Sequence, residues 1–454
     1  MIPLSAQELG TGLIFEPDRY EEVDLKPILV SRNYSSLPKA YSIKQYSPTP
    51  ESQGRYGTCT AWASAFAART ISESIAIGRT DKILSSSNAY SPAFLYKSIS
   101  NDPDCNDGVS IIAAMEFMKN EGIVKRLPIE SILDFKDVQL SLFESSKRYP
   151  ISDFVRLFLK WGVFQIEGDE KIIPVKKSIA EGKPVIIAFN DAPSFKLAYN
   201  RELWEPFIYE NYNTIYSGHA LCVVGYDDNK YGGAFEIQNS WGSNWGRDGY
   251  VWMRYADFDN WVREAYEIIE NLTNFKEVAE FSASIKIEVY TNNDGMPVKY
   301  DQQGFYRTQS SYPSGTDFRF LMTNKHPSYV YAFSADGNTT RIERIFPLRG
   351  ISPILDYSES TIAWPGEYDW IRLDQITGTD YLVVLYSKEA LNIDEIEKRF
   401  ANESGSFPER VARSVGLNFI NYSNVQYNPN NMEFSTQSPN MKAVFGLLLA
   451  IDHN

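Results

Sequence analysis

Four residues of this 454-residue chain have types and an order that suit nucleophilic catalysis by a thiol. Gln53 stands six positions before Cys59, and His219 and Asn239 follow in that order. A thiolate is a strong nucleophile, an imidazole can take up and return its proton, and an amide can hold the imidazole in one orientation. A glutamine N–H can stabilise the oxyanion that forms when a thiolate attacks a carbonyl. The four residues therefore predict acyl-transfer chemistry on Cys59.

The position of Cys59 in the predicted secondary structure supports this interpretation. Small and apolar residues recur through 59–77 and Gly78 follows as a stop, which predicts a helix that begins at the cysteine. The positive end of a helix lowers the pKa of a thiol, and a neighbouring imidazolium lowers it further. Cys222, by contrast, lies among apolar residues of a predicted strand and is expected in the core.

The segments around these residues resemble a known family. Gln53 to Cys59 includes Gln53-Gly54, His219 follows Gly218, and Asn239-Ser240-Trp241-Gly242 opens a twelve-residue stretch that ends at Tyr250. These segments resemble the active-site segments of the papain-like cysteine peptidases. The resemblance implies that Cys59 is the nucleophile, His219 the acid and base, Asn239 the residue that orients the imidazole, and Gln53 an oxyanion donor.

The same resemblance implies a substrate cleft. Cys105-Asn106-Asp107-Gly108 is similar to a family segment that lines one side of the cleft, although a plain turn accounts equally well for Asp107 and Gly108. The half-cystine that usually pairs with this cysteine is missing, so we expect Cys105 to be free. The residues expected to contact substrate are Asp107, Gly108, Gly218, Trp241 and Trp245. The chain departs from the family pattern where Thr60 and Ala61 separate Cys59 from Trp62.

The predicted elements divide the first part of the chain into two lobes. Helices are predicted over 59–77, 91–99, 110–120 and 153–161, and strands over 184–189, 220–226, 234–238 and 250–253. This is an α+β pattern, and it is similar to the two-lobed papain-like layout of a helical lobe and a β-barrel-like lobe. The cleft is then expected between the lobes.

A different pattern begins near residue 270. Short aromatic and β-branched strands, among them 318–324, 329–333, 380–388 and 444–451, predict a β-sandwich-like C-terminal domain. It resembles an accessory domain of unknown function from bacterial multidomain proteins. We therefore expect an N-terminal extension over 1–45, a peptidase domain over 46–270 and a β-rich domain over 271–454. His326 and His453 have no recognisable partner in the sequence.

The N-terminal extension leaves two questions open. Leu37-Pro38 resembles the opening of the mature domain in the family, and the piece before it is much shorter than the usual inhibitory propeptide. Met1 to Gln7 resembles the end of a secretory signal, which predicts export to the periplasm or medium. If it is an ordinary tail, the protein is cytoplasmic.

Composition restricts the partners. The net charge of −14 argues against a nucleic-acid or anionic-membrane partner, and no apolar run approaches the roughly 20 residues of a membrane-spanning helix. Three scattered cysteines predict neither a zinc site nor a disulfide framework, and no cofactor is expected. The expected partners are protein or peptide substrates. Two alternatives remain: a transglutaminase-like acyl transferase on the same scaffold, and a binding protein with a vestigial cleft.

Overall fold

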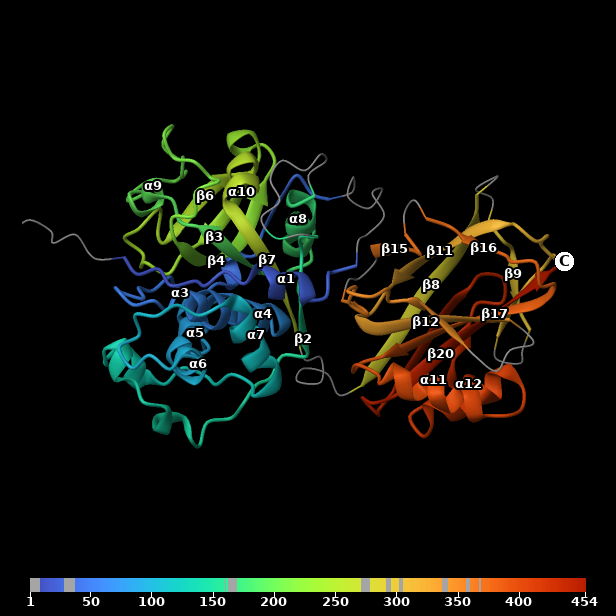
Figure 1. Ribbon diagram of the computed structural model, residues 1–454. Helices are drawn as coiled ribbons and strands as arrows, with labels where there is room; N and C mark the ends of the chain where they lie inside the picture. Colours follow the sequence, from blue (N-terminus) through green and yellow to red (C-terminus); the bar gives the residue numbers. More distant parts are fainter. Residues whose placement is uncertain are drawn as a thin grey trace, which may run out of the picture. The chain divides into compact units, whose positions relative to one another are not determined.

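The chain divides into two compact units. The computed structural model describes residues 9–27, 37–159, 161, 170–270, 278–290, 295–301, 305–336, 342–356, 360–366 and 369–454. The first unit combines Met1–Leu25 with Leu37–Asn271, and the second combines Lys26–Ser36 with Leu272–Asn454. Most of the N-terminal extension is therefore part of the first unit (Figure 1). Met1 to Gln7, the possible signal remnant, lies outside the described residues.

A continuous buried helix forms the centre of the first unit. It begins with α3 (Cys59–Ala61), continues through the π-helical turns of η2 (Trp62–Arg69) and ends with α4 (Thr70–Ala76). This confirms the predicted helix over 59–77. Ala63, Ala65 and Ala67 are buried on it, and such small side chains allow the sheet to approach the helix closely. The close approach brings the first residue, Cys59, near the sheet.

Two further helices of this lobe begin at serine caps. The Ser91 hydroxyl accepts a hydrogen bond from Phe94 N before α6 (Pro92–Ile99), and the Ser110 hydroxyl accepts one from Ala113 N before α7 (Ile111–Asn120). A side-chain oxygen at this position satisfies a backbone N–H that has no partner inside the helix. Both helices match the predicted ones. The smaller helical elements nearby are α1 (Pro17–Glu22), η1 (Lys44–Tyr46), α5 (Lys82–Ser87), η3 (Pro128–Ser131), η4 (Phe135–Asp137) and η5 (Leu140–Phe143).

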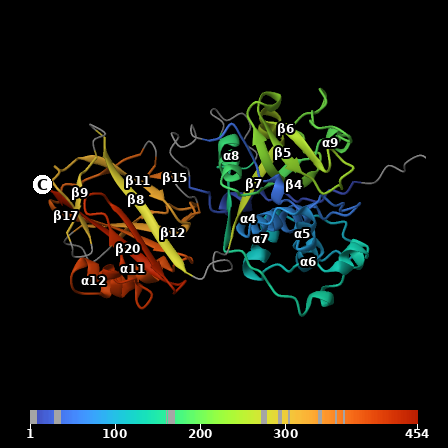
Figure 2. The same cartoon turned by 180° about the vertical axis from the view of Figure 1, so that it is seen from behind.

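The second lobe of this unit is a seven-stranded sheet in the order β2-β7-β3-β4-β5-β6, with β1 paired to β4. Its strands are β1 (Ala40–Ser42), β2 (Asp153–Arg156), β3 (Val185–Asn190), β4 (Gly218–Asp227), β5 (Ala234–Gln238), β6 (Tyr250–Arg254) and β7 (Val262–Ile269). Three helices accompany it: α8 (Ile172–Ala180), α9 (Pro193–Lys196) and α10 (Tyr255–Trp261). In both views most of the sheet lies on one side of helices α4 to α7 as a second lobe, and Figure 1 shows β2 beside α7 (Figures 1 and 2).

The prediction of a helix over 153–161 is wrong, because none of the residues described in this range is helical. Residues Asp153–Arg156 form β2, which pairs antiparallel with β7 from Asp153↔Ile269 to Arg156↔Tyr266. Phe154 and Val155 have strand-favouring side chains, and both are buried. Pairing with β7 satisfies their backbone groups, so the sheet decides the conformation of this short segment.

The second unit is a pair of sheets around one apolar core. One sheet has the order β13-β12-β17-β20-β10-β9 with β14 on β12, and the other has the order β15-β11-β8-β19-β18 with β16 on β11. Apolar residues of both sheets share this core, which confirms the β-sandwich-like prediction. Its strands are β8 (Ala279–Val289), β9 (Val298–Tyr300), β10 (Tyr306–Thr308), β11 (Asp317–Asn324), β12 (Ser328–Asp336), β13 (Glu343–Phe346), β14 (Ile354–Leu355), β15 (Ser360–Trp364), β16 (Ile371–Arg372), β17 (Gly378–Ser387), β18 (Gln426–Tyr427), β19 (Glu433–Ser438) and β20 (Val444–His453).

Two helices, α11 (Ile393–Asn402) and α12 (Phe407–Val415), and the short η8 (Tyr422–Asn424) also belong to the second unit. Within the described residues of both units, no helix is long and apolar enough to cross a membrane.

Candidate active site

The fold brings the start of the central helix against the sheet at Cys59. Cys59 is the first residue of α3, and His219 is the second residue of β4. The backbone N–H of Ala220, the next residue along β4, donates to Cys59 Sγ at 3.4 Å. Cysteine and histidine, 160 positions apart in the sequence, are thus held at one contact between the lobes.

The orientation of the Asn239 amide determines which nitrogen of His219 carries the proton. Asn239 Oδ1 lies 2.8 Å from His219 Nε2 and also accepts a hydrogen bond from Ser240 N at 2.7 Å. Because a backbone N–H can only donate, the oxygen of the amide must face both groups. His219 Nε2 is then the donor, and Nδ1 of the neutral ring has a free lone pair. Within the described part of the chain, this buried Nδ1 makes no hydrogen bond.

An aromatic cluster supports the imidazole. The Trp241 ring stacks on His219 with centroids 4.5 Å apart and an interplanar angle of 21°. Trp245 meets Trp241 edge-on at 5.3 Å, and Phe195 lies 4.9 Å from Trp245. Trp245 is fully buried in this cluster, so it lies behind Trp241. Packing of this kind excludes water from the His219–Asn239 hydrogen bond and makes it stronger.

Gln53 is held by two hydrogen bonds. Its Oε1 accepts from the Ser240 hydroxyl at 2.5 Å, and its Nε2 donates to the Tyr56 carbonyl oxygen at 2.8 Å. An amide nitrogen has two N–H groups, so one remains for another acceptor. Ser240 therefore contacts both Asn239, through its backbone, and Gln53, through its side chain.

Burial disfavours the charged forms of both the Cys59 thiol and the His219 imidazole. Burial raises the pKa of Cys59 to about 11, an effect that hydrogen bonds from the backbone N–H groups of Ala220 and Gly12 only partly offset. Burial also lowers the pKa of His219 to about 3, although the hydrogen bond to Asn239 opposes that change. Removal of water penalises both members of a thiolate–imidazolium pair. Burial at this site therefore favours the thiol of Cys59, which is less reactive than a thiolate.

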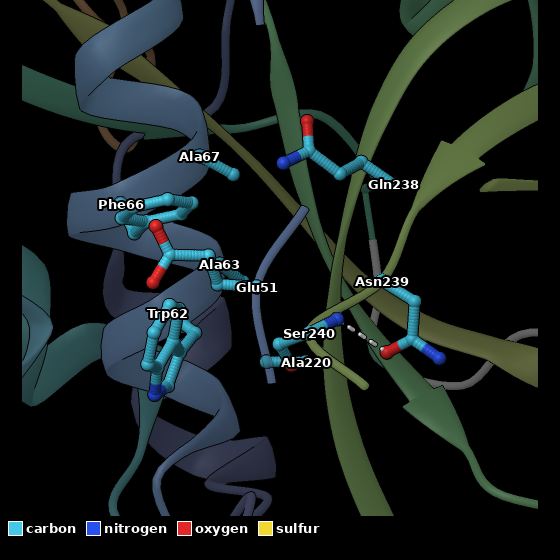
Figure 3. A pocket seen from close by; sticks show the side chains of 9 residues that line it. All are labelled: Glu51, Trp62, Ala63, Phe66, Ala67, Ala220, Gln238, Asn239 and Ser240. Atoms are coloured by element: carbon cyan, nitrogen blue, oxygen red, sulfur yellow. Dashed lines mark hydrogen bonds between the residues drawn. The ribbon is translucent and has the colours of Figure 1, made fainter. Parts of the chain in front are cut away.

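A narrow pocket lies between the lobes behind these residues (Figure 3). Trp62, Ala63, Phe66 and Ala67 of η2 line one side, and Gln238 to Ser240 line the other. The Gln238 side chain points toward the helix, whereas the Asn239 side chain points to the opposite side, toward His219 (Figure 3). The alternation expected of an extended strand thus directs Asn239 to the imidazole.

Residues 10–14 lie across the cleft, and we call them the cleft segment. Leu13 N–H donates to the Gly218 carbonyl oxygen at 3.0 Å, and the Gly12 carbonyl oxygen accepts from Val109 N at 2.8 Å. The Gly10 carbonyl oxygen accepts from Trp241 Nε1 at 2.8 Å. Cys59 and His219 have no exposed surface. The polar composition of the N-terminal extension gave no sign of this placement.

The cleft segment contacts three of the five residues expected to bind substrate. Gly218 accepts a hydrogen bond from Leu13, and Trp241 donates one to Gly10. Gly108 is close as well, because a Cβ on it would lie 2.0 Å from the Gly12 carbonyl oxygen. Asp107 has a different setting: its carbonyl oxygen accepts from Tyr96 OH, and its N–H donates to Asp102. Trp245 contacts the aromatic cluster.

Sequence reasoning did not single out Ser240 as a functional residue, although it stands beside Asn239.

The second unit contains a histidine cluster that was not expected. His453 Nε2 lies 2.9 Å from Ser314 Oγ, and its Nδ1 lies 3.1 Å from Asp380 Oδ2, so His453 does have partners. The order serine–histidine–carboxylate is that of a nucleophile relay. However, the N–H groups of Ser314 and Gly315 already donate to Asn454 and Leu373 carbonyl oxygens. Neither is available to an oxyanion, and the cluster instead connects the end of β20 with β17 and with the loop before β11.

A helical lobe, a sheet lobe, and a cysteine at the start of the helix that is hydrogen-bonded to the strand carrying a histidine are the features of a cysteine protease fold. The chain belongs to the papain family of cysteine proteases, whose family model matches residues 38–269, just over half of the chain. Cathepsin K of Gallus gallus is 30% identical over 218 residues, which cover 46% of this chain and 55% of that protein. Cathepsin K of Mus musculus is 26% identical over 217 residues, 46% of this chain and 57% of that protein.

An uncharacterized peptidase C1-like protein of Acanthamoeba polyphaga mimivirus is 28% identical over 134 residues, which cover 28% of this chain and 42% of that protein. The chain thus spans about half the length of the curated relatives it matches. Among solved structures, xylellain, a cysteine protease from Xylella fastidiosa, is similar with a TM-score of 0.43 and 22% identity over 58% of this chain and 97% of that one.

Proposed function

We propose that this protein is a thiol peptidase that hydrolyses peptide bonds through an acyl-thioester on Cys59. His219 Nδ1 takes the thiol proton as Cys59 Sγ bonds to the substrate carbonyl carbon. The tetrahedral intermediate then expels the amine, to which His219 gives the proton, and the C–N bond breaks. Water attacks the thioester with His219 as the base, which releases the acid product and restores the thiol. Asn239 keeps the imidazole oriented throughout.

The observation that carries this proposal is the pair of hydrogen bonds to Asn239 Oδ1. These bonds, from His219 Nε2 and Ser240 N, leave His219 Nδ1 as the basic nitrogen of the neutral ring. The contact between Ala220 N and Cys59 Sγ keeps the thiol beside that histidine. Membership of the papain family supports the same chemistry, and it gives no support to the transglutaminase-like alternative over hydrolysis.

Oxyanion stabilisation is the role proposed for Gln53. Its second amide N–H and the backbone N–H of Cys59 are the proposed donors. Loss of one such donor typically lowers kcat by roughly 100- to 1,000-fold. Both hydrogen bonds that hold Gln53 limit its rotation, so its donor is preorganised for a charge that develops only during the reaction.

Protein or peptide substrates are proposed from the family alone. The test is digestion of a mixed peptide library under reducing conditions, followed by mass spectrometry of the products. Wild type is compared with Cys59→Ala, His219→Ala and the matched control Cys222→Ala, which removes a buried cysteine on β4 outside the site. We expect cleavage by wild type and the control, and none by the other two variants.

Each of the other results would overturn the proposal. Cleavage that survives Cys59→Ala would show that another group performs the chemistry. Greater incorporation of an added primary amine than of water would support an acyl transferase. A chain that is alkylated at Cys59 by iodoacetamide but cleaves no peptide would support the binding protein with a vestigial cleft.

A further inference from the structure

A pocket lies over β8 on the outer side of the second unit. Ile285 and Ile287 of β8 belong to the apolar core, so the alternate residues Ser284 and Lys286 face the opposite side of the sheet. The pocket opens on this outer face and has a volume of about 450 Å³; we call it the β8 pocket. Small-molecule sites typically have volumes of roughly 300–1,000 Å³.

The floor of the β8 pocket combines an apolar spot with hydroxyl groups. Strands β15, β11 and β8 run side by side here (Figure 1). Leu321 of β11 lies opposite Ala363 of β15, and the two form a small apolar cluster that is separate from the main core. Farther along the same face, the hydroxyl oxygens of Thr323 and Thr361 lie 2.7 Å apart. A ligand in the pocket would contact both kinds of surface.

One wall of the β8 pocket carries side-chain amides that are available to a ligand. Asn430 and Asn431 are exposed in the turn before β19 and line the pocket. Their backbone N–H groups donate to Asn428 Oδ1 at 3.1 and 3.3 Å, which holds the turn. Their side-chain amides make no hydrogen bond to another described residue. Each amide offers two donors and an acceptor.

The charged side chains that line the β8 pocket have opposite signs and are paired within the protein. Lys286 Nζ lies 3.7 Å from Glu288 Oε1, and Glu433 Oε1 lies 2.6 Å from Lys325 Nζ. The lining residues that the structure describes therefore have no net charge. An ionic ligand would have to compete with these ion pairs, so the pocket favours a neutral ligand.

The backbone beside the β8 pocket favours a compact ligand over a peptide strand. β8 lies between β11 and β19 in the sheet. Beyond its pairing with β19, Ile285 N donates to the Met432 carbonyl oxygen at 2.8 Å, and the Ile287 carbonyl oxygen accepts from Met296 N at 3.2 Å. A peptide that adds a strand to a sheet needs backbone groups without partners. These groups are already used, so side chains must hold the ligand.

Two aromatic side chains continue the same face beyond the β8 pocket. Arg319 stands two positions before Leu321 on β11 and therefore shares its face. The Arg319 guanidinium lies 4.5 Å from the centroid of the Trp370 ring, and Tyr290 meets Trp370 edge-on at 5.1 Å. The Tyr290 side chain is 63% exposed. Tyrosine and tryptophan combine an apolar ring with a polar group, which suits a ligand with C–H and hydroxyl groups.

We propose that the β8 pocket binds a neutral saccharide. The hydroxyl groups of a sugar both donate and accept hydrogen bonds, which matches the amides of Asn430 and Asn431. The C–H groups of its ring can contact Leu321, and further sugar units can extend toward Trp370. A purely apolar ligand would leave the polar groups of the pocket without partners, which costs binding free energy. This inference concerns the second unit and does not rest on the chemistry at Cys59.

The test applies full-length protein to an array of immobilised neutral and anionic saccharides. Isothermal titration calorimetry then measures the affinity for the neutral saccharide that is retained best. Wild type is compared with the double variant Asn430→Ala/Asn431→Ala and with Asn402→Ala, which removes an exposed amide on α11 outside the pocket. We expect the double variant to bind about tenfold more weakly or worse, because several hydrogen bonds are lost. The control Asn402→Ala should match wild type.

A second variant tests the location of the site in a different way. Ser284→Phe keeps both amides but fills part of the β8 pocket with an aromatic ring, and it should abolish saccharide binding. Its circular dichroism and thermal unfolding, compared with those of wild type, establish that it folds. The double variant changes only exposed side chains of a turn, so it serves as the test even if Ser284→Phe does not fold.

Three results would overturn the inference. The array could retain no saccharide, or it could retain anionic saccharides alone, which would show attraction to charge. Wild-type affinity in the folded double variant would show that the saccharide binds elsewhere. Peptide cleavage is not part of this test, so the proposed function can fail while saccharide binding stands, and the reverse.

Discussion

The hydroxyl of Ser240 donates to Gln53 Oε1 at 2.5 Å, while the backbone N–H of the same serine donates to Asn239 Oδ1 at 2.7 Å. One residue therefore fixes the side chain proposed to stabilise the oxyanion and the side chain that orients the histidine. Because Gln53 belongs to the segment before the helix and Asn239 follows β5, Ser240 also couples the two lobes at the site. We propose Ser240 as a positioning residue.

Replacing Ser240 should weaken oxyanion stabilisation without touching the thiol. In Ser240→Ala the Gln53 amide loses one of its two hydrogen bonds, and we expect kcat to fall by about tenfold, less than the loss typical of a missing donor. Steady-state kinetics checks this. In a protein that already carries Gln53→Ala, adding Ser240→Ala should lower kcat little further. Independent, multiplicative losses would contradict the coupling.

Asn239→Ala should reduce kcat more than it raises KM. Without Oδ1 the imidazole loses its preferred orientation and tautomer, and we expect a loss of about 10- to 100-fold in kcat. Asn239→Asp is the matched control, because a carboxylate oxygen can still accept from His219 Nε2 and Ser240 N. Equal losses in both variants would argue against the tautomer explanation.

Asp191 should make stability depend on pH. Its side chain has no exposed surface, Lys196 lies 3.7 Å away, and burial raises its pKa to about 7. At a pH above the ordinary aspartate pKa of 3.8, Asp191 loses its proton in the unfolded chain but keeps it in the folded chain. The free energy of unfolding therefore falls as the pH rises toward 7. The slope is at most about 1.4 kcal/mol per pH unit.

Asp191→Asn should remove this contribution. The measurement is the free energy of unfolding by urea from pH 4 to pH 8, with Asp18→Asn on the exposed part of α1 as the control for loss of one charge. A variant that keeps the wild-type slope would show that Asp191 is not the responsible group.

The first unit should fold and react without the second. Its residues group into a compact unit with its own apolar core, so a chain that ends near residue 275 should keep its alkylation and peptide-cleavage rates within a few-fold of the full-length protein. Loss of all activity from a soluble, folded shortened chain would contradict independent domains.

Much of this architecture follows from local sequence signals. The serines before α6 and α7, the small residues of the central helix and the apolar strand after His219 have short-range causes, and the structure confirms the elements they predict. The four candidate catalytic residues, Gln53, Cys59, His219 and Asn239, could be named from their types and order. Their joint position could only be expected from the family, because it depends on contacts between distant segments.

The features that the sequence did not reveal have long-range causes. The strand at Asp153–Arg156 exists because β7 pairs with it. The cleft segment shows no periodic pattern of hydrophobic residues. Its contacts are mostly backbone hydrogen bonds, and its two glycines have no side chains that could form such a pattern. His453 gains Ser314 and Asp380 as partners only when β20 and β17 lie side by side.

The central helix has one more contact with the end of the first unit. Arg69 of η2 is fully buried, and its Nη1 lies 2.9 Å from Glu270 Oε1, at the residue that follows β7. The range by which the family is recognised stops at residue 269, one position earlier. A protein shortened to that range would keep the buried guanidinium of Arg69 but lack the carboxylate that pairs with it. Such a defect typically lowers the free energy of unfolding by about 3–5 kcal/mol. The smallest stable fragment of the first unit is therefore longer than residues 38–269, the range that identifies its family.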